Sequence, residues 1–386
     1  MKHSNKKPIY ADYAATTPIS AGVLDAMRPY LTEHYGNPSS LHYYGRKAQH
    51  AIDEARAQIA TILRRDHTEI IFTATATESI NTFFHSAILE AQQQGIQKPH
   101  IITTTIEHSA VLEACRYAEQ HHSATVRYIS PDSEGIINPQ SIQDALTKNT
   151  VLVSIGYANN EIGTVQPMRT ITSILKNHPT LIHTDATQAI GYCNIQEDIV
   201  PIHAITFSAH KIYGPKGIGL LYIKKGTPIH SLIVGGKQEH SHRAGTENVA
   251  AIVGFAKALA ETETIKQQEY KRQKQLQNTL ITDLLKNPAI TLNGSRTHRL
   301  PNNIHISIEN IKNDSALPYL DDRGICVATG SACTSNTPEP SHVLIALGRT
   351  EQQAKSGIRI TIGRNTTQEE VRTIAQTIHT MTRDIS

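Results

Sequence analysis

The chain of 386 residues is long enough for two lobes, and its 18% charged and 39% hydrophobic residues are those of an ordinary globular protein. This composition excludes a disordered chain and a coiled coil. The formal net charge of +3 is small for this length, and no window is dense enough in Lys and Arg to predict a nucleic-acid surface.

The first thirty residues lack the apolar core of a signal peptide, because Asp12, Asp25 and prolines interrupt them. No later stretch reaches the roughly eighteen apolar residues of a membrane span. We therefore expect a soluble, cytoplasmic protein with no membrane partner. Its four cysteines, at positions 115, 193, 326 and 333, form neither a CxxC pair nor a dense framework, which favours reduced thiols over disulfides or a metal site.

Short apolar runs alternate with amphipathic helical stretches between about residues 45 and 255. This alternation predicts an α/β fold with a mainly parallel sheet and helices on both faces. The predicted strands are Ile70–Thr73, His100–Thr104, Thr125–Ile129, Val151–Ile155, Leu181–Asp185, Ala204–Ser208 and Ile218–Ile223. Before the first strand, Ile52, Ala55, Ile59 and Ile62 recur at helical spacing, so this helix should pack on the sheet.

The C-terminal part of the chain has a different pattern. A long helix is predicted from Ala250 to Lys286, with Pro288 as its stop, and it should connect two lobes. Strands follow at Asn303–Ile308 and Ile358–Ile362, and Thr367 with Glu370 forms a capping box before a last helix. These elements predict a small α+β lobe.

Three segments carry groups suited to cofactor chemistry. Lys211 follows an apolar strand and precedes a Gly/Pro turn, which suits a Schiff-base lysine but also a surface lysine. Asp185 ends another strand, where it could pair with the ring nitrogen of pyridoxal phosphate (PLP) or simply cap a helix. The hydroxyl-rich stretch Thr75–Ser79 predicts a helix start that could bind phosphate, or a capped helix without a ligand.

These segments belong to a longer, ordered set of motifs. The further motifs are Asp12-Tyr-Ala-Ala-Thr-Thr-Pro18, Gly36-Asn-Pro-Ser-Ser40, Thr105-Ile-Glu-His108, Asn159-Asn-Glu-Ile-Gly163 and Gly330-Ser-Ala-Cys333-Thr-Ser335. Together they resemble the cysteine desulfurases of the class V aminotransferase group, specifically the NifS/IscS branch, over nearly the whole chain. The resemblance implies the PLP-dependent transferase fold type I, with an N-terminal segment (1–15) packed on the small domain, a PLP-binding large domain (16–255) and a small domain (256–386).

The resemblance also implies a role for each matching residue. Lys211 would be the Schiff-base lysine and Cys333 the thiol that receives the sulfur, while His108 would stack on the PLP ring and move protons. Arg359 would bind the substrate carboxylate together with Asn160, although strand alternation alone would place it on an outward face. The remaining cofactor contacts would come from Ala76, Thr77, Asn160, Asp185, Gln188, Ser208, His210 and Thr246, the last of these reaching the other subunit's PLP phosphate.

The implied reaction is removal of sulfur from L-cysteine, which leaves alanine and a Cys333 persulfide. The persulfide would pass to a sulfur-acceptor protein for iron-sulfur cluster assembly or tRNA and cofactor thiolation, and the enzyme would be a homodimer without a nucleic-acid partner. The alternatives are a selenocysteine lyase, a kynureninase-like hydrolase, an aminotransferase, or a non-catalytic partner-binding subunit. Cys333 lies in a polar Gly/Ser/Thr-rich stretch that suits an exposed thiol, unlike the apolar run around Cys326.

Several positions depart from the family pattern. Relatives usually have Gly where this chain has Thr75, so the loop geometry or PLP affinity could differ. Lys237 replaces the third glycine of a triplet, and His240 replaces a basic residue. The chain ends at Ser386, without the scaffold-docking tail of the IscS type, so a housekeeping enzyme and a dedicated paralogue for another acceptor both stay open as alternatives. The long loop with Cys333 favours this branch over the SufS-like one.

Overall fold

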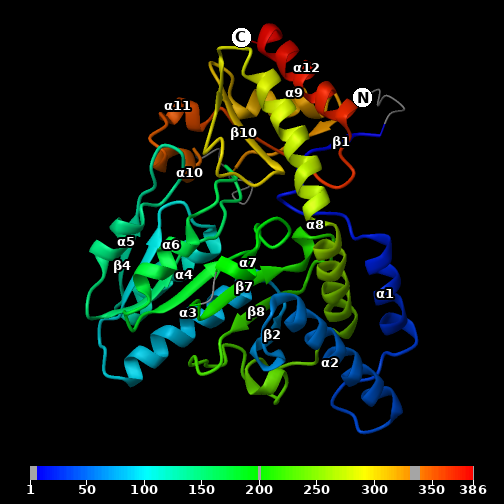
Figure 1. The fold of residues 1–386 in the computed structure, drawn as a ribbon, viewed down its shortest axis with the longest axis vertical. Helices are drawn as coiled ribbons and strands as arrows, with labels where there is room; N and C mark the ends of the chain where they lie inside the picture. The colour runs from blue at the N-terminus through cyan, green and yellow to red at the C-terminus, as the bar shows by residue number, and fades with distance from the viewer. Residues whose placement is uncertain (1–6, 199–200, 331–339, 386) are drawn as a thin grey trace.

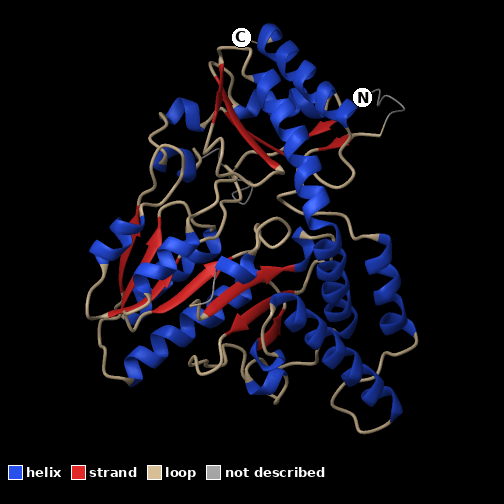
Figure 2. Ribbon diagram, in the orientation of Figure 1, coloured by secondary structure: helices blue, strands red, loops and turns tan. Residues whose placement is uncertain are grey.

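The computed structural model describes residues 7–198, 201–330 and 340–385. A seven-stranded mixed sheet forms the centre of the larger part of the molecule (Figure 1, Figure 2). In spatial order its strands are β2 (Ile70–Thr73), β8 (Gly219–Ile223), β7 (Ala204–Ser208), β6 (Leu181–Asp185), β5 (Thr150–Ser154), β3 (His100–Thr104) and β4 (Thr125–Ile129). Only β8 runs antiparallel to its neighbours, so the other six strands share one direction.

The sheet buries both of its faces, because successive side chains of a strand point to opposite sides. Ile70 and Phe72 pack in one hydrophobic core while Ile71 packs in the other. The first core also holds side chains of α1 (Ala21–Thr32), α2 (Tyr43–Leu63), α5 (Pro139–Ala145), α6 (Met168–Leu175) and α7 (Ile195–Asp198). The second core holds α3 (Ala76–Gln93) and α4 (Ser109–His122). The predicted α/β architecture is confirmed.

The helix α8 (Val249–Leu284) links this sheet region to a second, smaller one (Figure 1). Its residues up to Leu259 pack in the first core, and those from Leu276 onward pack in a separate core. The predicted domain boundary after residue 255 therefore falls inside one continuous helix. The helix ends before Pro288, as the sequence predicts.

An antiparallel three-stranded sheet lies in the small region, in the order β12 (Gly357–Thr361), β10 (Asn303–Ile308) and β9 (Ile290–Leu292). The small region also contains four helices, which are α9 (Asn313–Asp321), α10 (His342–Ala346), α11 (Glu351–Ala354) and α12 (Gln368–Asp384) among the described residues. The predicted capping box of Thr367 and Glu370 opens α12. Near the N-terminus, β1 (Ile9–Tyr10) pairs in parallel with β11 (Ile325–Cys326), so the start of the chain lies on the small region.

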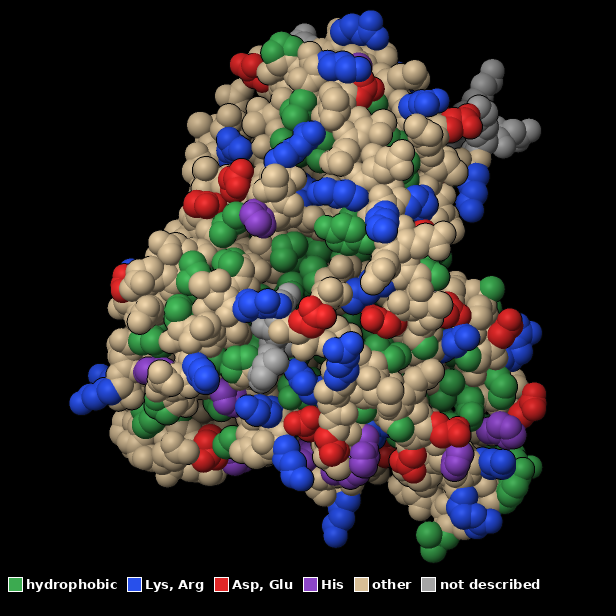
Figure 3. Space-filling view, in the orientation of Figure 1, with side chains coloured by type: hydrophobic (Ala, Val, Ile, Leu, Met, Phe, Trp, Pro, Cys, Tyr) green, Lys and Arg blue, Asp and Glu red, His purple; other side chains and the backbone are tan. Residues whose placement is uncertain are grey.

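Short 3-10 turns complete the fold as η1 (His67–Glu69), η2 (Ala209–Lys211) and η3 (Glu239–Ser241). On the face shown in Figure 3, basic and acidic side chains are interspersed. Within the described ranges, no helix combines the length and the apolar character that crossing a membrane requires.

Candidate active site

The ends of neighbouring strands bring the predicted chemical groups to one edge of the large sheet. Asp185 ends β6, Ser208 ends β7, and His108 follows β3 as the N-cap of α4. Because these strands are parallel, their carboxyl ends lie at the same edge. Side chains that are far apart in sequence therefore converge there.

A cavity of about 540 Å³ opens at this edge, between the large sheet and the small region. The predicted site residues that line it are Ala76, Thr77, His108, Asn160, Asp185, Gln188, Ser208, His210, Lys211 and Arg359. Thr246 is exposed and is not among the lining residues, and Cys333 lies outside the described residues. Gly330, directly before the undescribed stretch, does line the cavity.

The start of α3 forms an anion-binding corner of the cavity. The Thr75 hydroxyl caps the helix by accepting the N–H of Glu78 at 3.1 Å. This leaves the first-turn N–H groups of Ala76 and Thr77 without partners inside the helix, beside the cavity. Opposite them, Gly219 leaves no room for a side chain, since a Cβ there would lie 2.6 Å from the Thr75 carbonyl carbon.

The expected disturbance from Thr75 is not present in the loop geometry. Thr75 has φ −155° and ψ 163°, an extended conformation that β-branched residues adopt without strain. A glycine is therefore not needed at this position for its conformational freedom. The hydroxyl instead supplies a helix cap that glycine lacks.

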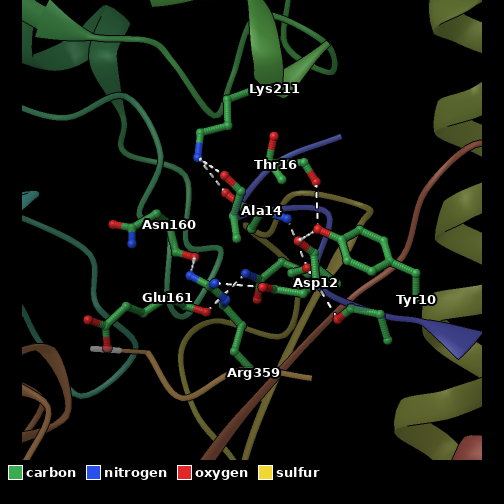
Figure 4. A network of polar contacts seen from close by, with 12 residues as sticks. Tyr10, Asp12, Ala14, Thr16, Asn160, Glu161, Lys211 and Arg359 are labelled. Atoms are coloured by element: carbon green, nitrogen blue, oxygen red, sulfur yellow. Dashed lines mark hydrogen bonds and ion pairs between the residues drawn. The ribbon is translucent and has the colours of Figure 1, made fainter. Parts of the chain in front are cut away.

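Lys211 lies at the end of η2, directly after β7, and its amine extends toward the N-terminal segment (Figure 4). The Nζ atom donates hydrogen bonds of 2.7 Å to the carbonyl oxygens of both Ala14 and Ala15. Gln188 Nε2 also donates to the Ala14 carbonyl, at 3.1 Å. Two carbonyl dipoles therefore hold the lysine amine at the cavity wall.

Asp185 presents its carboxylate to the cavity from the end of β6. One of its oxygens accepts the N–H of Thr187 at 2.9 Å, which fixes the side chain at the strand end. Thr187 lines the same cavity, and its hydroxyl oxygen is buried without a hydrogen-bond partner. A buried hydroxyl of this kind fits a polar ligand that completes its hydrogen bonding.

His108 is oriented by the backbone of its own helix. Its Nδ1 atom accepts the N–H of Ala110 at 3.1 Å, so Nε2 is the ring nitrogen that carries a proton in the neutral tautomer. Burial lowers the pKa of His108, and Lys211 lowers it further, whereas Asp185 acts in the opposite direction. The ring is thus neutral near pH 7 and has Nε2–H as a hydrogen-bond donor.

His210 is also held uncharged. Burial, with the charges of Lys211 and Lys216, lowers its pKa to about 4. Its Nδ1 atom lies 3.1 Å from the Thr16 hydroxyl. A neutral imidazole next to two lysines can contribute a hydrogen bond without adding a third positive charge.

Arg359 reaches the cavity from β12 and is only 3% exposed. Its Nη2 atom donates to Asp12 Oδ1 at 2.8 Å, and Nη1 donates to the carbonyl oxygen of Asn160 at 3.2 Å (Figure 4). The Nε atom is buried with no hydrogen-bond partner. The outward orientation that strand alternation alone predicts is wrong, because both faces of β12 are buried.

Sequence reasoning assigned no role to two charged residues at this site. Glu107 lines the cavity next to His108, and Asp12 pairs with Arg359. Both lie inside motifs that carry the family resemblance, and this position in a motif was the sequence feature that could have indicated a role. Neither motif indicated what the carboxylate contacts.

The remaining cysteines do not form a competing centre. Cys115 is buried, and Cys193 and Cys326 are partly exposed. The described ranges contain no group of three or more His, Cys, Asp or Glu side chains placed to hold a metal ion.

Comparison with known proteins places this chain among the class V aminotransferases, whose family model matches residues 9–374. The cysteine desulfurase IscS of Dictyoglomus turgidum is 44% identical over 95% of this chain and 92% of its own length. The cysteine desulfurase IscS of Methanosarcina thermophila is 42% identical over 97% and 92%. A solved structure titled NifS-like protein superposes with a TM-score of 0.90 and 36% identity, covering 97% of this chain and 99% of its own.

The molecule is thus an α/β enzyme of the PLP-dependent fold type I class. The chain belongs to the class V aminotransferase family. Its donor set fits PLP: helix-start N–H groups suit the phosphate, the Asp185 carboxylate suits a protonated ring nitrogen, and the unpartnered Thr187 hydroxyl suits a polar substituent. The names of these relatives do not favour a selenocysteine lyase or a non-catalytic subunit.

Proposed function

We propose that this chain is a PLP-dependent cysteine desulfurase that converts L-cysteine to L-alanine and carries the sulfur as a persulfide on Cys333. The observation that carries the proposal is the convergence of Lys211, Asp185 and His108 on one cavity that Arg359 also lines. An amine, a carboxylate, a neutral imidazole and a guanidinium are the groups that the binding of an amino acid and PLP needs. The cysteine desulfurase relatives support the same substrate.

Each group has a defined task in this proposal. When bound, PLP supplies an electron sink for the carbon next to the substrate amine. Lys211 would hold the cofactor, and the carbonyl oxygens of Ala14 and Ala15 would accept hydrogen bonds from its free amine. His108 offers its Nε2–H as a hydrogen-bond donor, since the Nδ1 lone pair accepts the N–H of Ala110.

The sulfur-transfer step needs no external oxidant. The thiolate of Cys333 attacks the sulfur of cysteine, so an S–S bond forms while the C–S bond breaks. The electron pair of the C–S bond stays on carbon, which is protonated to give alanine. The thiolate of Cys333 is thereby converted to a persulfide, and an acceptor protein would take the terminal sulfur in a later thiol exchange.

We further infer a homodimer. Thr246 is exposed outside its own cavity, which is consistent with a contact to the partner's cofactor. Large apolar side chains remain exposed on this subunit, among them Leu41 at 90% and Val234 at 82%. A second copy would remove such surface from water. Light scattering of the purified protein would test the expected mass of twice 42.5 kDa.

The activity is tested by incubating the PLP-loaded protein with L-cysteine, quantifying alanine and locating the extra sulfur by mass spectrometry. Lys211→Ala should lose the visible absorbance of the lysine-bound cofactor, and Cys333→Ser should lose persulfide formation. Cys326→Ser is the matched control, because it removes a thiol seven positions earlier and should retain both signals. Absence of alanine despite a bound cofactor would contradict the proposed reaction.

A further inference from the structure

The guanidinium group of Arg359 is held in one orientation from two sides. The Asp12 carboxylate accepts from Nη2 at 2.8 Å, and the Asn160 carbonyl accepts from Nη1 at 3.2 Å. The strand that carries Arg359 is itself fixed, since Arg359 is paired with His305 on β10 and bridged to Ala328. The ends of this long side chain therefore have little freedom (Figure 4).

Asp12 is in turn fixed by the backbone around it. The preceding strand β1 pairs with β11, and Asp12 itself forms a bridge with Thr361, two residues after Arg359. The Tyr10 hydroxyl donates to the Asp12 carbonyl at 3.0 Å and to the Thr16 carbonyl at 2.9 Å. The carboxylate is therefore presented by a hydrogen-bonded turn rather than by a free terminus.

Charge balance at this position depends on Asp12. A buried guanidinium needs a nearby anion, because transfer of an unpaired charge out of water is costly. Glu161 also lies near Arg359, but burial raises the pKa of its carboxyl group, and its Oε2 atom accepts the Ser341 hydroxyl at 2.5 Å. Asp12 makes the direct ion pair and is 21% exposed at its side chain.

We propose that Asp12 is a positioning residue that orients Arg359 to bind the α-carboxylate of the amino-acid substrate. This inference rests on the proposed function, in which Arg359 binds that carboxylate. It adds the requirement that the acidic residue Asp12 holds Arg359 in place. The Asp12 carboxylate accepts one hydrogen bond from Nη2. This contact fixes the directions of the buried Nε and of the remaining N–H bonds of the guanidinium group. Specificity for a carboxylate then comes from geometry as well as from charge.

The consequence is measurable as carboxylate selectivity. Asp12→Ala removes both the orienting acceptor and the counter-charge, and we expect the dissociation constant for L-alanine to rise about 10- to 100-fold, as for loss of a charge-assisted hydrogen bond. Binding of ethylamine, which is alanine without its carboxylate, should stay within about twofold of wild type. Asp12→Asn keeps an acceptor oxygen without the charge, so its dissociation constant for L-alanine should lie between those of wild type and Asp12→Ala.

The experiment titrates the PLP-loaded enzyme with L-alanine and with ethylamine and follows the visible absorbance of the cofactor. Asp25→Ala is the matched control, since Asp25 pairs with Arg28 on the exposed surface of α1 and should leave both affinities unchanged. The double variant Asp12→Ala/Arg359→Ala should bind alanine no more weakly than Arg359→Ala alone.

Two results would overturn the inference. One is an equal loss of affinity for alanine and ethylamine, which would mean that Asp12 maintains the cavity as a whole. The other is additive losses in the double variant, which would mean that the two residues act independently. A wild-type enzyme that binds alanine but does not desulfurate cysteine would instead contradict the proposed function and leave this test intact.

Discussion

Glu107 provides a quantitative test of the electrostatics at the cavity wall. Its two carboxyl oxygens accept the N–H of Gly156 at 3.0 Å, and Oε1 also accepts the Thr104 hydroxyl at 2.7 Å. Burial raises the pKa of the Glu107 carboxyl group from 4.5 to about 7, against the lowering effect of these hydrogen bonds, and Asp185 adds to the rise. Glu107→Gln keeps the size of the side chain and one acceptor oxygen.

The raised pKa sets the sign of the effect on stability. The unfolded chain releases this proton near pH 4.5 and the folded chain near pH 7, so the folded state binds more protons between these values. The free energy of unfolding therefore falls as pH rises through this window. At 1.36 kcal/mol per pH unit, the loss reaches about 3 kcal/mol above pH 7. A glutamine at this position does not ionise and escapes the loss.

The assay is urea unfolding of wild type and Glu107→Gln at equal protein concentration and saturating PLP, at pH values from 5 to 8. The variant should gain about 2.5 kcal/mol relative to wild type across this range, because part of the loss lies below pH 5, whatever constant cost its amide N–H₂ group introduces. Glu113→Gln changes an exposed carboxylate on α4 and should give a flat difference. A flat or falling difference for Glu107→Gln would refute the reasoning.

Three further changes test other parts of the structure. Glu239→Gln breaks the buried bidentate pair with Arg56 (2.8 and 2.9 Å) and should lower the free energy of unfolding by about 3–5 kcal/mol in urea. Thr75→Gly removes the cap on Glu78 and should cost only about 0.3 kcal/mol without improving PLP retention on dialysis. Cys115 should resist thiol reagents at pH 8 until the protein unfolds, because burial raises its pKa; labelling of the native protein would contradict this.

The large sheet could be predicted almost residue by residue, because each strand is a short apolar run between turn residues. The predicted Leu181–Asp185 and Ala204–Ser208 coincide with β6 and β7. The prediction Val151–Ile155 is displaced by one residue from β5 (Thr150–Ser154). The pattern of apolar residues cannot predict the first and last residues of β5, since these limits depend on which backbone groups pair with β3.

The short pairings could not be predicted. β1 and β11 are two residues long each and about 315 positions apart, so neither carries a periodic signal of its own. The domain division stays a prediction for a related reason. A mostly polar stretch of α8 separates Leu259 in the first core from Leu276 in the second, but the helix continues through this stretch, so no end of an element marks the boundary.

Side chains at strand ends could be placed in the candidate site because of a general property of parallel sheets. Asp185 and Lys211 follow neighbouring strands, and sheet order alone brings them to the same edge. The Asp12–Arg359 pair has no such rule, because its partners are 347 residues apart and meet through an N-terminal turn. Only the structure reveals that the carboxylate faces the guanidinium.

The N-terminal turn also shows that hydrogen bonds to backbone carbonyl oxygens cannot be predicted from residue types. Lys211 and Gln188 both bond to backbone carbonyl oxygens of this turn, and Asp12 in the same turn holds Arg359. Every residue has a carbonyl group, so nothing in the residue types of Ala14 and Ala15 could predict an acceptor role. Because one short segment contacts both the lysine and the arginine, a shift of its backbone would disturb the proposed cofactor and substrate contacts together, although they lie in different parts of the chain.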